Sequence, residues 1–384
     1  MDGGALSPRR TRTFAVAALS VLLCLPLTLS ESWAARATAN DPQLVSGAQW
    51  ALTGAPASIN APAAWCVSSG AGVLVADIDT GADFSHPDLA GKLIAGGRFT
   101  NGDGSPAAGG VGDDNGHGTM TTGLMVANTN NGIGIAAVAP GARALIVKVL
   151  NSDGSGSPAD VAAGIRYALN YRGPGGERVR VINLSIGGDT PALLNTVLAG
   201  TPLAAGTEVQ DAITSAAAGD VAVVAAAGNG GDGLLSPNDY GRLSGIALVA
   251  GAVGRNGARA FYSTNGNIFA PGGDSMGGRD AQHEITATTL GGGYGIAQGT
   301  SFAAPHVAGA VALLMGTGRY SAASARQQIL STAAAREGLA ELDAGAALGA
   351  AGSCVPSGAA VATTARHTTP THRATARHTA TRRR

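Results

Sequence analysis

The stretch Gly72-Val-Leu-Val-Ala-Asp-Ile-Asp79 predicts a buried β-strand, because its apolar and β-branched residues end at a turn formed by Thr80-Gly81. Similar apolar runs recur at 144–150, 179–184, 221–226 and 246–250. Helical spacing lies between such runs, as at 160–169, with Pro158 near its start. Strands separated by helices predict right-handed βαβ units. We therefore expect an α/β fold of three layers, with a mostly parallel central sheet and helices on both faces.

The N-terminal residues differ from the body of the chain. Arginines at 9, 10 and 12 precede an apolar run at 14–29 and small residues at 33–37, the pattern of a secretory signal peptide. A membrane anchor is the alternative, but a run of about 16 residues broken by Pro26 is short for a spanning helix. We expect a signal peptide over 1–37 and a secreted protein, extracellular or periplasmic, without a stable membrane anchor.

The C-terminal residues 355–384 are rich in Ala, Thr, Arg and His, with six Arg and no acidic residue. This composition predicts a disordered basic tail, either solvated and dispensable or attracted to anionic polymers. Outside both ends, which hold ten Arg and two acidic residues, 15 of the 25 basic and 23 of the 25 acidic residues remain. Such an acidic body, which we expect to be one monomeric domain over 38–354, gives no support to a nucleic-acid partner.

The chain contains three cysteines, of which Cys24 lies inside the expected signal peptide. Cys66 and Cys354 then stand at the two ends of the body. In an oxidising compartment they could form a disulfide that stabilises the fold by roughly 4–5 kcal/mol in the chain-entropy model. Two buried, unpaired thiols are an equal alternative.

Acyl transfer needs a nucleophile, a base and a carboxylate that orients the base, and the sequence offers one candidate for each. Asp79 ends a predicted strand, where a carboxylate projects into the crevice of a parallel sheet, although turn aspartates are common there. His117 lies between glycines in Asn115-Gly-His-Gly-Thr119, which a surface loop would also allow. Ser301, in Gly299-Thr-Ser-Phe-Ala-Ala-Pro-His-Val-Ala-Gly-Ala310, is predicted at a helix N-terminus, where N–H groups face the reacting oxygen. A simple N-capping serine would explain only part of that string.

Asn229 ends the stretch Ala225-Ala-Ala-Gly-Asn229, which follows another predicted strand. A side-chain amide at this place can donate a hydrogen bond to a developing oxyanion. Asn-Gly at 229–230 is otherwise typical of an ordinary turn.

Together these strings resemble the subtilisin family of serine peptidases (subtilases, peptidase family S8). Val75-Ala-Asp-Ile-Asp-Thr-Gly81 and the strings around His117 and Ser301 match its three active-site signatures in the family's order. The stretch before Asn229 matches its oxyanion segment, and the similarity extends from about Asp41 to Leu314.

The resemblance implies a serine endopeptidase that hydrolyses polypeptide substrates through an acyl-enzyme. Ser301 would be the nucleophile, His117 the base and then the acid, and Asp79 its orienting partner. Asn229 would bind the oxyanion together with the backbone N–H of Ser301. The P1 pocket would have one wall from Leu184, Ser185, Ile186 and Gly187, and another from Ala226, Ala227 and Gly228. Since Gly230 brings no charge to it, we expect broad cleavage that favours apolar or medium-to-large P1 residues.

The resemblance also implies a structural calcium ion. Asp88, in His86-Pro-Asp-Leu89, matches the family's calcium-binding aspartate. Asn131 falls on the loop that supplies side-chain and carbonyl oxygens to that site. Oxygen ligands from a loop suit Ca²⁺, although a polar surface turn would look similar.

Two departures from the family pattern stand out. After His117 the chain has Met120, Thr121 and Thr122, where the family usually has histidine, valine and alanine. Because threonine hydroxyls can bond back to earlier carbonyls, we expect these residues to affect helix packing more than proton transfer. The stretch between Ala37 and Asp79 resembles the start of a mature subtilase and does not fit a propeptide.

Two other readings compete with a broad-specificity secreted protease. The first is a catalytically silent, subtilase-like binding module, which would have no chemical need for all four catalytic groups. The second is a processing peptidase or peptide ligase with one dedicated partner, at which only the basic tail hints.

Overall fold

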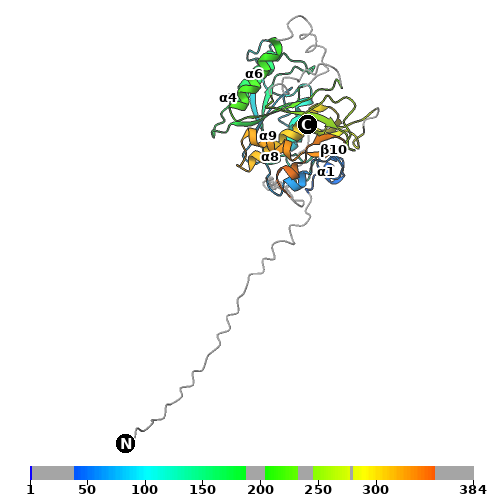
Figure 1. The fold of residues 1–384 in the computed structure, drawn as a ribbon. Helices are drawn as coiled ribbons and strands as arrows, with labels where there is room; N and C mark the ends of the chain where they lie inside the picture. The colour runs from blue at the N-terminus through cyan, green and yellow to red at the C-terminus, as the bar shows by residue number, and fades with distance from the viewer. Residues whose placement is uncertain (2–38, 187–203, 232–244, 277–279, 351–384) are drawn as a thin grey trace, which may run out of the picture. The chain divides into compact units, whose positions relative to one another are not determined.

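The computed structural model describes residues 1, 39–186, 204–231, 245–276 and 280–350, and the ribbon of the chain is shown in Figure 1. The chain divides into two units, Met1–Ala35, of which only Met1 is described, and Arg36–Arg384. The second unit contains all of the fold described below. The expected signal peptide, apart from Met1, and the expected basic tail lie outside the described residues.

The described part of the second unit is built on a nine-stranded sheet with the strand order β10-β11-β7-β6-β5-β4-β1-β3-β2. All of its pairings are parallel except that of β10 with β11. A separate antiparallel hairpin is formed by β8 and β9. The strands are β1 (Leu74–Asp79), β2 (Leu93–Arg98), β3 (Arg143–Lys148), β4 (Val179–Leu184), β5 (Ala222–Ala226), β6 (Leu248–Val253), β7 (Ile268–Pro271), β8 (Ile285–Thr289), β9 (Gly293–Ala297), β10 (Ala334–Arg336) and β11 (Leu339–Glu341).

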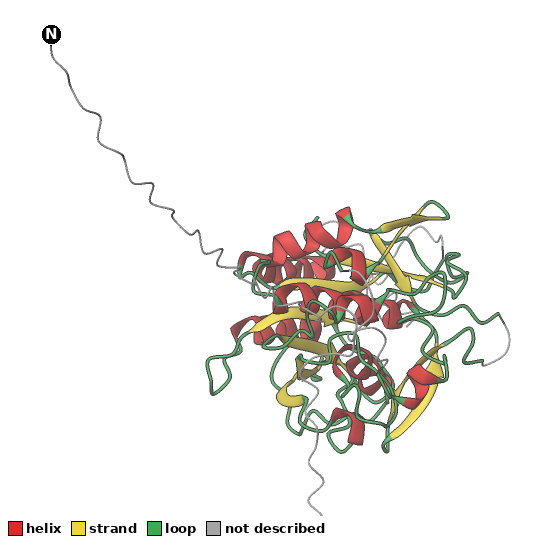
Figure 2. Cartoon of the chain, turned by 90° about the horizontal axis from the view of Figure 1, so that it is seen from below, coloured by secondary structure: helices red, strands yellow, loops and turns green. Residues whose placement is uncertain are grey.

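Helices cover both faces of this sheet, and Figure 1 shows α4 and α6 on one side of the strands and α8 and α9 on the other. Figure 2, coloured by secondary structure, shows strands running between helices. The longer helices are α3 (His117–Val126), α4 (Pro158–Asn170), α6 (Ala204–Ala218), α8 (Thr300–Gly316) and α9 (Ala322–Ser331). The short ones are α1 (Pro42–Val45), α2 (Ala61–Ala64), the 3-10 turn η1 (Pro87–Leu89) and α10 (Ala344–Ala347). The predicted three-layer α/β fold is therefore confirmed.

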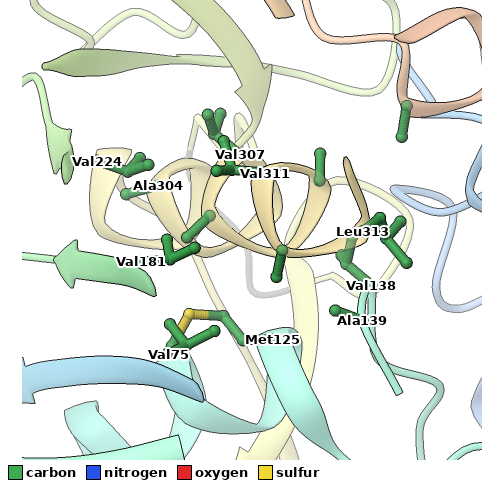
Figure 3. Close-up of a cluster of buried hydrophobic side chains, with 14 of the residues drawn as sticks. Val75, Met125, Val138, Ala139, Val181, Val224, Ala304, Val307, Val311 and Leu313 are labelled. Atoms are coloured by element: carbon green, nitrogen blue, oxygen red, sulfur yellow. The ribbon is translucent and has the colours of Figure 1, made fainter. Parts of the chain in front are cut away.

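Strand β1 divides its side chains between the two layers, because successive residues of a strand point to opposite faces. Ala76 and Ile78 belong to the core cluster under α4 and α6. Val75 belongs to the cluster under α3 and α8, where it packs near Met125 and Val181 (Figure 3). Helix α8 is buried from Thr300 to Met315, as expected for a helix that is apolar all round.

The position of β1 in the strand order explains where a site can form. The chain continues from β1 to β2 and β3 on one side, whereas β4 pairs with the other side of β1. The order therefore reverses at β1, and the crevice outside the carboxyl ends of strands at such a reversal is where α/β sheets bind ligands. Asp79 is the last residue of β1.

The predicted elements that are observed differ from the prediction mainly at their ends, whereas β2, β7, β8, β9, β10 and β11 were not predicted. The helix predicted at 160–169 begins at Pro158, behind a Ser157 side chain that accepts a hydrogen bond from Asp160 N. The run predicted from Ile246 becomes a strand only at Leu248. No described helix is long and apolar enough to cross a membrane.

Candidate active site

Asp79 and His117 meet at the carboxyl end of β1. The Asp79 side chain is 1% exposed, whereas that of His117, the first residue of α3, is 27% exposed. His117 Nδ1 lies 2.8 Å from Asp79 Oδ1 and 3.0 Å from Asp79 Oδ2. With Nδ1 committed to the carboxylate, the second ring nitrogen, Nε2, is the one that can exchange a proton with a neighbouring group.

The electrostatics of this pair favour a proton on the imidazole. Burial of the His117 ring opposes its charged form, but the charge and hydrogen bond of Asp79, together with the charges of Asp77 and Asp113, outweigh burial. The pKa of His117 is therefore raised above its usual 6.5. The imidazole is neutral, and ready to accept a proton, at pH values above this raised pKa.

The loop before His117 is held by a carboxylate that the sequence analysis did not single out. Asp113 accepts hydrogen bonds from Thr80 Oγ1 at 2.8 Å, Gly116 N at 2.9 Å and Thr119 N at 2.9 Å. Burial alone would raise its pKa, but these donors lower the pKa of Asp113 below its usual value. Gly116 has φ of 106°, a conformation that glycine adopts without strain. Asp113 thus fixes the turn from which α3 starts.

Ser301 lies in the first turn of α8 and is 7% exposed. The ring of the next residue, Phe302, stands 5.7 Å from the His117 ring, so this turn lies beside the imidazole. Pro305 has no N–H to donate to the Ser301 carbonyl one turn earlier. Ser185 Oγ takes that place and donates to Ser301 O at 2.8 Å. A buried hydroxyl on β4's trailing end therefore anchors the start of α8.

Asn229 follows β5 and joins the same helix start. Its Oδ1 accepts hydrogen bonds from Thr300 N at 2.9 Å and Thr300 Oγ1 at 3.0 Å. Gly228 N donates to Thr300 Oγ1 at 3.0 Å. Because Asn229 Oδ1 accepts these two hydrogen bonds from the helix N-terminus, the Nδ2 amide group is the part of the side chain that can donate to a ligand.

The two segments predicted to line a substrate pocket follow neighbouring strands. Strand β4 pairs with β5, with Leu184 opposite Ala225. Leu184, Ser185 and Ile186 are buried, as are Ala226, Ala227 and Gly228. Gly187 lies outside the described residues. The described residues of both segments therefore come to the same edge of the sheet as Asp79.

Asp88 and Asn131 also come together, although they are 43 residues apart in the sequence. Asn131 Nδ2 donates to Asp88 Oδ1 at 2.8 Å, and Ile135 N donates to Asp88 Oδ2 at 3.0 Å. A second buried carboxylate, that of Asp41, accepts from Asn131 N at 3.3 Å and was not predicted as part of the site. Burial, followed by repulsion from Asp88, raises the pKa of Asp41. No salt bridge from Lys or Arg reaches either carboxylate within the described ranges.

The described part of the chain contains no cluster of three or more His, Cys, Asp or Glu side chains that could hold a metal ion. Cys66 is disulfide-bonded, and its predicted partner Cys354 lies outside the described residues.

One further residue of the site was missed by the sequence analysis. Asp77, two positions before Asp79, is 1% exposed and accepts hydrogen bonds from Thr121 Oγ1 and Thr122 Oγ1. The signal was a charged residue inside an otherwise apolar strand. Thr121 Oγ1 lies 3.1 Å from Gly118 O, the kind of bond to an earlier carbonyl that was expected. The bonds of Thr121 and Thr122 to the Asp77 carboxylate were not predicted.

Comparison with known proteins places these features in a family. The sequence model described as "Subtilase family" matches residues 70–371. Thermitase of Thermoactinomyces vulgaris is 36% identical over 299 residues, which are 77% of this chain and 91% of thermitase. The major intracellular serine protease of Bacillus subtilis (strain 168) is 38% identical over 268 residues, 67% of this chain and 72% of that protein.

A solved structure with a closely related fold carries the description "Proteases from Pseudoalteromonas arctica". It superposes with a TM-score of 0.69 at 30% sequence identity, and the match covers 82% of this chain and 99% of that chain. The likeness therefore covers most of the chain in sequence and in structure.

Proposed function

This chain belongs to the subtilase family and is a subtilisin-like serine endopeptidase, and from that premise we propose that Asp79, His117 and Ser301 are its catalytic triad. The observation that carries the proposal is the 2.8 Å contact between His117 Nδ1 and Asp79 Oδ1 beside the first turn of α8. A nucleophile, a base and an orienting carboxylate on three separate elements are what acyl transfer requires.

In the proposed mechanism Ser301 Oγ attacks the carbonyl carbon of the scissile peptide bond while His117 Nε2 takes its proton. Asp79 holds the ring and stabilises the imidazolium. Nδ2 of Asn229 and the backbone N–H of Ser301 donate to the oxyanion. The imidazolium then protonates the leaving amine, and an acyl-enzyme remains. Water, deprotonated by His117, attacks the ester and releases the second product with the free serine.

We further propose that extended substrate pairs with the backbone of residues 184–187, by addition of a strand, and that P1 lies between this segment and 226–228. The Ser185 hydroxyl is already engaged by Ser301 O, so its contribution would come from the backbone. Broad cleavage with apolar or medium-to-large P1 residues is our proposal for specificity. A peptide-library profile dominated by Arg or Asp at P1 would contradict it.

The deciding experiment is hydrolysis of casein by the wild type and by Ser301→Ala, together with labelling by a fluorophosphonate. We expect the wild type to digest casein and take up one label, and the variant to do neither. A variant that still digests casein would refute the triad. Labelling without casein hydrolysis would favour a processing peptidase or ligase, and a wild type that does neither would favour a binding module.

We also propose a stabilising Ca²⁺ with Asp88 as a ligand and Asn131 on the binding loop. Two buried carboxylates, Asp88 and Asp41, without a Lys or Arg partner among the described residues fit a hard divalent cation with oxygen ligands. Such an ion would neutralise the mutual repulsion of the carboxylates. A chelator should then lower the melting temperature, and Asp88→Asn should abolish that sensitivity. A melting temperature indifferent to the chelator would contradict the proposal.

We propose that the protein is secreted after cleavage of a signal peptide over 1–37. The remaining chain would consist of a monomeric peptidase domain over 38–354 and a dispensable basic tail over 355–384. Relatives of the chain include proteases named as intracellular, so location must be measured for this protein. Mass spectrometry of the protein in the culture medium, and after reduction, tests the cleavage near residue 37 and the pairing of Cys66 with Cys354. Retention of the uncleaved chain inside the cell would refute secretion.

A further inference from the structure

Asp77 lies beneath the catalytic groups in a position that a carboxylate rarely occupies. It is in β1, two residues before Asp79, so both side chains point to the same face of the sheet. The next residue on that face, Val75, belongs to the apolar core under α3 and α8. Asp77 is 1% exposed, and no salt bridge reaches it within the described ranges. Its burial therefore carries a cost that hydrogen bonds must offset.

The bonds come from two neighbouring elements. Thr121 Oγ1 and Thr122 Oγ1, on α3, lie 2.9 Å and 2.6 Å from Asp77 Oδ2. Asn183 Nδ2, on β4, donates to Asp77 Oδ1 at 2.9 Å. Thr121 stands one helical turn after His117, so the carboxylate is held by the same helix that carries the base.

The hydrogens of this cluster can be arranged in two complete ways. Thr121 Oγ1 lies 2.9 Å from Asp77 Oδ2 and 3.1 Å from Gly118 O, but a hydroxyl has one hydrogen to donate. If Asp77 is ionised, Thr121 donates to it. If Asp77 is protonated on Oδ2, it donates to Thr121, which then donates to Gly118 O. Both protonation states are therefore hydrogen-bonded, and they differ at the residue that follows His117.

A second branch connects Asp77 to the nucleophile. Asn183 Nδ2 donates not only to Asp77 but also to Ser185 Oγ at 2.9 Å. Ser185 Oγ in turn donates to Ser301 O at 2.8 Å. A continuous chain of hydrogen bonds thus runs from Asp77 to the backbone of the residue that we propose as nucleophile.

Several other ionisable groups lie near Asp77, and their states make His117 the base whose protonation the charge of Asp77 can affect. Lys148, on β3, is engaged with Asp114 at 2.7 Å and with Thr80 O. His306, on α8, is neutral near pH 7 because burial lowers its pKa to about 4. Asp79 lies on the same strand, and Asp113 precedes α3.

The charges of Asp77 and His117 act on each other. Burial, and then the charge of Asp79, raise the pKa of Asp77 to about 7. Asp77 is in turn one of the charges that raise the pKa of His117. Because each charge acts on the other group, the protonation of Asp77 and that of His117 are coupled.

We propose that Asp77, held against α3 by the hydroxyls of Thr121 and Thr122, is a positioning residue whose charge sets the pH at which His117 loses its function as base. The inference rests on the proposed triad. Ionised Asp77 favours the inactive imidazolium, whereas protonated Asp77 makes the imidazolium harder to form. Loss of activity on acidification is then spread over two coupled titrations instead of one.

The test is the pH profile of kcat/KM for the wild type and Asp77→Asn. An amide resembles protonated Asp77 at every pH, so the acidic limb should steepen to a single ionisation with its midpoint lower by roughly half a pH unit. Near pH 7 the variant should exceed the wild type by about two- to threefold after normalisation to the alkaline plateau, and the normalised curves should converge in acid.

Controls separate this role from a purely structural one. Asp160→Asn changes an equally buried carboxylate that binds Gly102 N and Gly104 N on the α4 side of the sheet, and it should leave the limb in place. Thr122→Val keeps Asp77 but removes a hydrogen-bond donor to its ionised form. It should therefore shift the acidic limb of the kcat/KM profile to lower pH, by less than Asp77→Asn does. This variant keeps the proposal testable if Asp77→Asn folds poorly. NMR titration of His117 in the Ser301→Ala background gives the pKa without turnover.

Two outcomes distinguish the levels of the proposal. If Ser301→Ala still hydrolyses casein, the proposed triad fails, whatever Asp77 does. If Ser301→Ala is inactive but Asp77→Asn and Thr122→Val keep the slope and midpoint of the wild type, the coupling of Asp77 to the base is overturned. A change in kcat with an unchanged pH profile would also overturn it, because that is the effect of a structural residue alone.

Discussion

The hydrogen bond from Ser185 to the start of α8 can be tested quantitatively, because it takes the place of a bond that Pro305 cannot make. Pro305 cannot donate to Ser301 O, and the Ser185 hydroxyl replaces the missing N–H at 2.8 Å. Ser185→Ala removes this donor and leaves a buried carbonyl without its partner. Leaving a buried acceptor unpaired costs about 1–3 kcal/mol. We expect the free energy of unfolding to fall by that amount.

A second substitution tests the cause of this loss. In Pro305→Ala the backbone N–H at position 305 can donate to Ser301 O, one turn earlier, as in an ordinary helix. The cost of Ser185→Ala should then fall by about 1 kcal/mol in the Pro305→Ala background, which appears as a coupling energy in the double-mutant cycle. The remaining cost reflects the bond between Asn183 Nδ2 and Ser185 Oγ.

Unfolding by urea, measured in a Ser301→Ala background to prevent self-digestion, gives the four free energies of the cycle. Ser263→Ala is the matched control, because Ser263 is equally buried but bonds to Ala252 N and Thr264 O. Its cost should be the same with Pro305 and with Ala at that position. Equal costs of Ser185→Ala in both backgrounds would refute the idea that the hydroxyl substitutes for the backbone donor.

Three further predictions concern catalysis and the loop that carries the base. Asn229→Ala should lower kcat by about 100–1,000-fold with little change in KM, the range known for loss of the oxyanion asparagine in subtilisin itself; a loss below tenfold would contradict its role. Because the pKa of His117 is raised, kcat/KM should increase with pH through a midpoint above 6.5, and a midpoint below 6 would contradict the charge effect of Asp79. Because the pKa of Asp113 is lowered, its contribution to folding is present above the unfolded-state pKa and lost as the pH falls through the folded-state pKa. Asp113→Asn should therefore lower the melting temperature at pH 7 by more than at pH 3, and an equal loss at both pH values would count against the hydrogen bonds as its cause.

The sequence predicted five of the nine strands of the sheet, β1, β3, β4, β5 and β6, because these are continuous apolar runs, which local pattern alone can identify. It did not predict β2, β7, β10 and β11, which are short or contain glycines and exposed residues. It predicted β1 to end at Asp79 and it anticipated the helix that begins at Pro158. It did not predict the hairpin of β8 and β9, although Tyr294 and Ile296 alternate with small residues after the glycines at 291–293. Hairpin pairing depends on register and turn type, which a scan for apolar runs does not examine.

The candidate site was predicted where one residue carries its own chemistry and was missed where several residues act together. Asp79, His117, Ser301 and Asn229 each stand in a distinctive string. In the sequence, Asp77 in an apolar strand and the threonines in a buried helix appear as unrelated polar residues within apolar segments. Only the packing of α3 against β1 brings the two together and makes each supply what the other lacks.

Strand β1 is hydrogen-bonded on both edges, to β3 and to β4, and lies under helices on both faces. Its amide protons should therefore exchange with solvent only when the whole domain opens. We therefore expect Asp79, the proposed orienting carboxylate, to lie in the slowest-exchanging part of the domain. On heating, hydrolytic activity should disappear together with the last protected amides of β1, so that loss of activity reports on global unfolding.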